Sequence, residues 1–121
     1  MIVPGDSNIK PIEYAGWYMA RELIGRGIQI LRWQGPMMHA KTAVVDGTWA
    51  CVGSYNFDAR SLRYNLEVVV EIIDRDFAAT LDRQFALDRA NTRPFDLAAW
   101  RALSWWRKAA TWCAFQLRRW L

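Results

Sequence analysis

The dipeptide Asp46-Gly47 follows an alternating segment, residues 39–45, and it constrains the fold more than any other feature of the chain. Asp-Gly is a strong signal for a two-residue β-hairpin turn. The pattern predicts a strand over residues 39–45 whose alternate side chains share one face. If Asp46-Gly47 is the centre of the turn, His39 lies opposite Ser54. A four-residue loop around the same turn places His39 opposite Asn56 instead.

The histidine at the start of this segment is the only one in the chain. From His39 to Asn56 the sequence follows the pattern H-x-K-x4-D-x6-G-S-x-N. Two residues of strand span about 6.6 Å, so the imidazole of His39 and the ammonium of Lys41 can converge on one phosphate group. The segment therefore combines a candidate nucleophile, an anion-binding cation and the hydrogen-bonding side chains of Ser54 and Asn56. Chemistry of this kind needs a second acid or base, and the chain has no second imidazole.

Hydrophobic periodicity predicts helices and strands on both sides of the hairpin. Strands are expected at residues 2–3, 28–33 and 65–73. Helices are expected at residues 11–26 and 74–89, and from residue 97 to the end. Thr92-Arg93-Pro94 interrupts the helical pattern, so we expect a main domain of residues 1–92 and a separate tail of residues 93–121.

Composition limits the class of protein. An apolar content of 53% in 121 residues excludes a disordered chain and allows one domain with a real core. No stretch approaches the roughly 18 consecutive apolar residues of a membrane span. The net charge of +4 favours an anionic partner.

The tail is both basic and rich in tryptophan, and it has no acidic residue beyond Asp96. One interpretation is a terminal helix packed on its own domain. The other is a helix in the plane of an anionic membrane surface, which Trp105, Trp112 and Phe115 favour because they widen the apolar face. The expected apolar stripe consists of Trp100, Leu103, Trp106, Ala110, Cys113, Leu117 and Trp120. The expected polar side consists of Arg101, Ser104, Lys108, Thr111 and Arg118 or Arg119.

The motif resembles the HKD motif of the phospholipase D superfamily, and the downstream Asp58, Arg60-Ser61 and Asn65-x-Glu67 look like the continuation of that motif. With Val3-Pro4-Gly5-x-Ser7 and the Trp- and Arg-rich C-terminus, the chain looks most like the C-terminal half of bacterial cardiolipin synthases. The resemblance implies an α/β fold, namely a phospholipase D-like half-domain with a mixed β-sheet flanked by helices, followed by a C-terminal amphipathic helix. The matching positions of the motif are His39, Lys41, Asp46, Gly53, Ser54 and Asn56.

The resemblance implies a role for each candidate catalytic residue, with no cofactor and no metal. His39 would be the nucleophile or the matching acid, and Lys41 and Asn56 would hold phosphate oxygens. Ser54 would line the pocket, and Glu67 would hydrogen-bond the imidazole and set its tautomer. Asp46 completes the motif, although its place at the far end of the hairpin favours a role in forming the turn.

The resemblance also implies a reaction and its partners. Two phosphatidylglycerol molecules would give cardiolipin and glycerol through a phosphohistidine, at the cytoplasmic face of the bacterial membrane. Each half of such an enzyme gives one histidine, so the chain is expected to be a fragment that needs a second HKD half or a second copy. The membrane surface would be bound through residues 97–121, and nucleic acid is not an expected partner. The alternatives are a homodimeric phospholipase D-like phosphodiesterase or nuclease and an inactive membrane-binding remnant.

Overall fold

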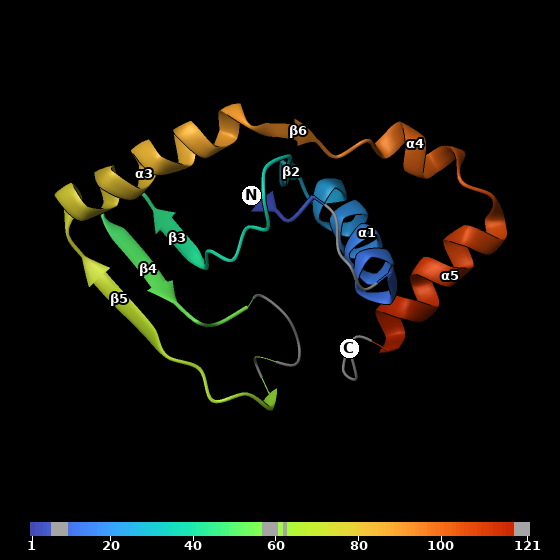
Figure 1. Cartoon of the computed structure of the whole chain (residues 1–121), viewed down its shortest axis with the longest axis horizontal. Coiled ribbons are helices and arrows are strands. Elements are labelled where there is room, and N and C mark those ends of the chain that lie inside the picture. The colour runs from blue at the N-terminus through green and yellow to red at the C-terminus, as the bar shows by residue number, and fades with distance from the viewer. Residues whose placement is uncertain (6–9, 57–60, 62, 118–121) are drawn as a thin grey trace.

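The computed structural model of the chain describes residues 1–5, 10–56, 61 and 63–117. It contains both β-sheets and helices that flank them, which confirms the expected α/β class (Figure 1). The strands are β1 (Ile2–Val3), β2 (Leu31–Trp33), β3 (Thr42–Val45), β4 (Trp49–Gly53), β5 (Val69–Ile73) and β6 (Thr92–Pro94). The helices are α1 (Lys10–Gly25), α3 (Arg75–Ala90), α4 (Leu97–Ala102) and α5 (Trp105–Gln116).

The strands form two three-stranded sheets rather than one. In the first sheet β1 runs parallel to β2, and β6 runs antiparallel to β2, so this sheet is mixed. The second sheet, β3–β4–β5, is antiparallel. Helix α3 packs on β3 and β4, where Ala78 of the helix and Ala50 of β4 are both 0% exposed. Small side chains at both positions let the helix approach the sheet closely.

The predicted turn at Asp46-Gly47 is present, but the hairpin has neither of the two predicted registers. Both turn residues have positive φ, 52° and 59°, and the N–H of Thr48 donates to the carbonyl of Val45 at 3.2 Å, as in a type I′ turn. Val45 nevertheless pairs with Trp49, so Thr48 is one extra residue. The carbonyl of Thr48 instead accepts a hydrogen bond at 3.0 Å from the residue that follows β5. The third strand therefore determines the register of the hairpin.

Three strands are shorter than the sequence predicts, because residues 28–30, 39–41 and 65–68 lie outside them. His39 and Lys41 therefore precede β3 instead of sharing one of its faces. The reason is the end of β4 at Gly53, whose backbone N–H donates to the carbonyl of Lys41 at 3.1 Å. Residues before Lys41 consequently have no strand to pair with.

The predicted helices at residues 11–26 and 74–89 are confirmed as α1 and α3, each to within one residue at both ends. Asp74 is the N-cap of α3, and its Oδ1 accepts a hydrogen bond from the N–H of Phe77 at 2.7 Å. The single C-terminal helix predicted from residue 97 is wrong. Leu103 and Ser104 have extended ψ values of 142° and 153°, which separate α4 from α5.

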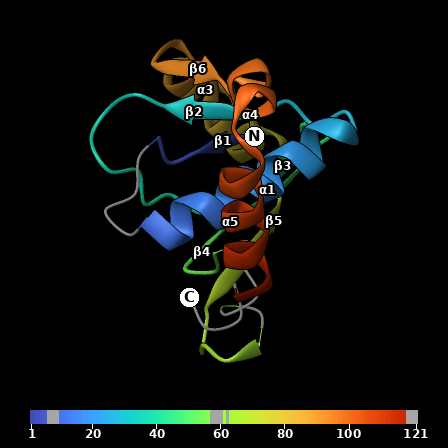
Figure 2. The same ribbon diagram turned by 90° about the vertical axis from the view of Figure 1, so that its right-hand side faces the viewer.

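Helices α1 and α5 pack against each other at the edge of the molecule (Figures 1 and 2). The rings of Tyr18 and Phe115 lie 4.8 Å apart between them. Thr111, predicted on the polar outer side of the tail, is instead 1% exposed in this contact region. Within the described residues no helix is both long enough and apolar enough to cross a bilayer.

Candidate active site

His39 lies in the segment between β2 and β3, and its side chain is exposed. The ammonium of Lys41 donates a hydrogen bond to the carbonyl of His39 at 2.9 Å. The carbonyl of Lys41 in turn accepts from the N–H of Gly53 at 3.1 Å. These two bonds hold the H-x-K segment beside the corner at Gly53-Ser54, where β4 ends.

The side chain of Ser54 joins this corner to the segment before β5. Its hydroxyl donates to a carboxylate oxygen of Glu67 at 2.5 Å and accepts from the N–H of Val68 at 3.0 Å. The amide of Asn65 donates to the other oxygen of Glu67 at 3.2 Å and to the hydroxyl of Ser61 at 3.4 Å. Ser61 is only 4% exposed, so the network is anchored on a buried hydroxyl. It fixes the position of the Glu67 carboxylate.

Hydrogen bonds hold Glu67 in its ionised form. The bonds from Ser54 and Ser61 lower the pKa of Glu67 below its ordinary value, and Asn65 and the charge of Lys41 act in the same direction. Burial opposes them without reversing the sign. The corner therefore combines a fixed carboxylate with the neighbouring positive charge of Lys41.

Glu67 forms no hydrogen bond with the imidazole of His39 in the part of the chain that the structure describes. Among the described residues, the side chains that hydrogen-bond Glu67 are Ser54, Ser61 and Asn65. The imidazole of His39 forms no hydrogen bond within the described part of the chain. The structure thus brings Lys41, Ser54 and Glu67 together and leaves the His39 ring outside their network.

Two other members of the motif lie apart from this network. Asn56 is exposed and directly precedes residues 57–60, which lie outside the described residues. That range contains the motif positions Asp58 and Arg60. Asp46 lies in the turn at the opposite end of the hairpin, where its carbonyl accepts from the hydroxyl of Thr48 at 3.2 Å.

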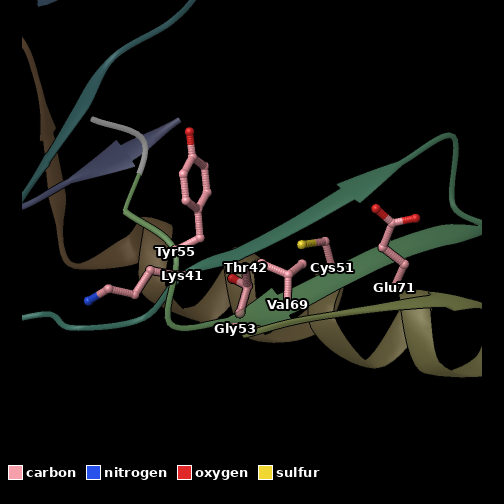
Figure 3. A pocket seen from close by; sticks show the side chains of 7 residues that line it. All are labelled: Lys41, Thr42, Cys51, Gly53, Tyr55, Val69 and Glu71. Carbon is pink, nitrogen blue, oxygen red and sulfur yellow. The ribbon is translucent and has the colours of Figure 1, made fainter. Parts of the chain in front are cut away.

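A shallow cavity of about 220 Å³ opens beside Lys41 on the β3–β4–β5 sheet. It lies on the sheet face opposite α3, because Cys51 lines it while the neighbouring Ala50 faces the helix. Figure 3 shows the side chains of Tyr55 and Glu71 at opposite ends of the cavity on this face. The lining residues are Lys41, Thr42, Cys51, Gly53, Tyr55, Val69 and Glu71.

The sequence assigned no role to Ser61, Asn65 or Tyr55. Ser61 and Asn65 carry a signal, because both belong to the R-S-x3-N-x-E run that follows the motif. Tyr55 carries none, since its place in the cavity depends on where β4 ends. Among the described residues no three His, Cys, Asp or Glu side chains come together as a metal site requires.

An α/β fold in which one hairpin brings H-x-K beside a G-S-x-N corner defines a phospholipase D-like protein. The chain belongs to this family: the family model described as "Cardiolipin synthase, PLD-like domain" matches residues 1–89. The family resemblance drawn from the motif is therefore confirmed.

Curated relatives extend this result over most of the chain. Cardiolipin synthase A of Erwinia tasmaniensis is 31% identical over 108 residues, which are 89% of this chain and 22% of that protein. Cardiolipin synthase B of Escherichia coli is 30% identical over 120 residues, which are 98% of this chain and 29% of that protein. The chain thus spans less than a third of the length of these relatives.

One solved structure has a similar fold. It is the phospholipase D family member Nuc from Salmonella typhimurium, with a TM-score of 0.54 and 23% sequence identity. The match covers 59% of this chain and 48% of Nuc. At this identity the likeness supports the fold class alone.

Proposed function

We propose that the chain is one half of a phosphatidyltransferase of the cardiolipin synthase type. The observation that carries this proposal is the corner at which Lys41, Ser54 and the ionised Glu67 meet beside the H-x-K segment. A cation and fixed hydrogen-bond donors next to a histidine suit the transfer of a phosphoryl group. The second acid/base group comes from another HKD half or from a second copy of the chain.

The proposed reaction has two steps. A nitrogen of the His39 imidazole attacks the phosphorus of one phosphatidylglycerol, and the bond from phosphorus to the glycerol oxygen breaks. The partner's imidazolium gives its proton to that oxygen, and glycerol leaves. The same partner imidazole then removes the proton from a hydroxyl of a second phosphatidylglycerol. This oxygen attacks phosphorus, the bond to His39 breaks, and cardiolipin is formed.

The remaining residues of the motif act on this phosphate. Lys41 and Asn56 hold its oxygens, and Ser54 lines the pocket while keeping Glu67 in place. Glu67 holds the imidazole tautomer when the ring of His39 turns toward the corner. Asp46 acts from the turn, where it contributes to the alignment of β3 with β4.

The proposed setting is the cytoplasmic face of a bacterial membrane, to which the chain binds peripherally. Its substrate is an anionic phospholipid, phosphatidylglycerol, and residues 97–121 bind the surface that contains it. Residues 1–92 form the catalytic half and residues 93–121 the membrane-binding tail, although β6 spans the boundary between residues 92 and 93. The chemistry requires neither a cofactor nor a metal.

The decisive experiment measures cardiolipin by mass spectrometry after incubation with phosphatidylglycerol vesicles. The chain is tested alone and mixed with the N-terminal HKD half of a related cardiolipin synthase. We expect cardiolipin in the mixture, its loss with His39→Ala, and no loss with Gln84→Ala on the exposed side of α3. Absence of cardiolipin in both preparations would falsify the proposal.

A second candidate is a homodimeric phosphodiesterase that cleaves nucleic acid, with one histidine from each copy. The single histidine and the net charge of +4 favour it. A strand-cleavage assay with His39→Ala as control separates it from the first proposal. Cleavage that requires His39, without any cardiolipin formation, would establish this alternative.

A further inference from the structure

Helix α5 turns its polar side toward the rest of the chain. Thr111 is 1% exposed and Ala114 is 8% exposed, and both lie on the side that meets α1. A spacing of 100° per residue places Arg107, which is exposed, between Thr111 and Ala114, and Lys108 at the margin of this inner side. The packing of α5 on α1 therefore uses small and hydroxyl side chains of the helix, together with the ring of Phe115.

The opposite side of α5, its outer face, is apolar. Trp105 is 81% exposed, Trp106 55% and Trp112 49%, and Leu117, directly after the helix, is 55% exposed. Such a cluster of large apolar side chains on one exposed helix face usually marks an interaction site. The outer face consists of Trp105, Trp106, Ala109, Trp112, Cys113, Gln116 and Leu117, of which only Gln116 is polar.

Contacts on the inner side hold this orientation. Two cations lie near the ring of Trp100 on α4, the Arg21 guanidinium of α1 at 5.0 Å and the Lys108 ammonium of α5 at 5.5 Å. Lys108 also donates to the carbonyl of Arg101 in the last turn of α4 at 2.6 Å. The outer face is thus formed before any partner arrives, and its binding needs no folding of the helix.

The charges around the outer face indicate the partner. From Leu97 onward the sequence has no acidic residue, while Arg101 and Arg107 are exposed. The guanidinium of Arg107 lies 5.0 Å from the ring of Trp106, at the margin of the apolar face. Indole rings prefer the headgroup level of a bilayer, and guanidinium groups bind lipid phosphates.

We infer that the outer face of α5 docks on a bilayer surface that contains anionic phospholipid. Trp105, Trp106 and Trp112 enter the headgroup region, with Arg101 and Arg107 on the lipid phosphates. This inference rests on the membrane partner proposed above and is independent of the catalytic step. Figures 1 and 2 show α5 at the outer edge with α1 between it and the β3–β4 hairpin, so docking leaves the motif on the other side of α1.

The test is co-sedimentation of the full chain with vesicles of phosphatidylcholine alone or mixed with phosphatidylglycerol. The test variant is Trp105→Ser with Trp112→Ser. Its matched control is Phe85→Ser with Leu87→Ser, which removes two exposed apolar side chains (42% and 65% exposed) from α3. We expect the test variant to bind mixed vesicles about tenfold more weakly, or worse, because it buries less apolar surface. The control variant and His39→Ala should bind like the wild type.

A second variant, Arg101→Gln with Arg107→Gln, tests the charges. We expect it to lose the preference for vesicles that contain phosphatidylglycerol, and we expect salt to weaken wild-type binding. Circular dichroism of each variant checks that helix content is kept.

Three results would overturn the inference. The first is that the tryptophan variant binds vesicles as strongly as the wild type does. The second is that the wild type binds both kinds of vesicle equally. The third is self-association of the wild type without lipid that the tryptophan variant abolishes, which would make the outer face a protein interface. None of these results depends on turnover, so a failure of the docking inference can be distinguished from a failure of the catalytic proposal.

Discussion

Helices α3 and α5 are both amphipathic, but they turn opposite sides toward the part of the chain on which they pack. Helix α3 places the fully buried Ala78 against the sheet and faces solvent with a largely charged side. Helix α5 places Thr111 inward and its tryptophans outward. An amphipathic pattern therefore predicts that a helix has two different faces, without predicting which of them meets protein.

The difference follows from what each helix packs on. The sheet under α3 presents small and β-branched side chains, so burial of apolar area holds the helix in place. Helix α1 places the ring of Tyr18 against Phe115 of α5 and the guanidinium of Arg21 near the ring of Trp100 on α4. The ammonium of Lys108 on α5 lies near the same Trp100 ring. Cation–π contacts and hydrogen bonds can hold such an interface, and the tryptophans of α5 remain free for another partner.

The same substitution on both helices tests this comparison most strongly. Ala78→Leu overfills the contact between α3 and the sheet, and we expect it to lower the free energy of unfolding by about 1–3 kcal/mol. Ala109→Leu on the outer face of α5 should change it by less than about 0.5 kcal/mol. Urea denaturation followed by circular dichroism measures both. Equal losses would mean that the outer face of α5 is packed after all.

The N-cap residues of the two helices offer a second, smaller contrast. Asp74 caps α3 with a side-chain hydrogen bond to Phe77, whereas Ser104 forms no such bond at the start of α5. We expect Asp74→Ala to lower the free energy of unfolding by about 1 kcal/mol and Ser104→Ala by less than half of that. Thermal denaturation of the two variants provides the comparison, and a larger loss from Ser104→Ala would contradict it.

Local sequence signals predicted the elements that local chemistry can form. The Asp46-Gly47 turn requires positive φ at both positions, and both residue types tolerate it, so the turn was predictable. Helix α3 has a capping aspartate and clear periodicity, so its start was predictable as well. The motif likewise placed His39 and Lys41 next to the Gly53-Ser54 corner.

Contacts between distant segments decided the rest. The hairpin register depends on Thr48, whose carbonyl bonds to the residue after β5, and nothing within the hairpin reports this. The start of β3 depends on where β4 ends, at Gly53, whose N–H bonds to the carbonyl of Lys41. The inward side of α5 depends on the aromatic surface of α1. The hairpin register, the extent of β3 and the orientation of α5 each depend on a segment that is distant in the sequence, so local patterns could not predict them.

The last contrast between the two regions is their response to acid, since the corner of the site contains Glu67 and α5 contains no carboxylate. The folded pKa of Glu67 lies below its ordinary value of 4.5, so its interactions stabilise the fold above that pH. This contribution is lost as the pH falls from about 4.5 through the folded pKa. Ser54→Ala removes the largest cause of the shift.

We therefore expect Ser54→Ala to raise the pKa of Glu67 toward its ordinary value, so that the acid loss of stability becomes smaller and is complete at a higher pH. Carboxyl carbon NMR titration measures the pKa, with Thr80→Ala as a control because its hydroxyl bonds only within α3. At neutral pH Glu67 is ionised both in the wild type and in Ser54→Ala, so the effect of this substitution on stability is the smallest of the three. An unchanged pKa of Glu67 in Ser54→Ala would show that Ser61 and Asn65 hold the carboxylate without Ser54.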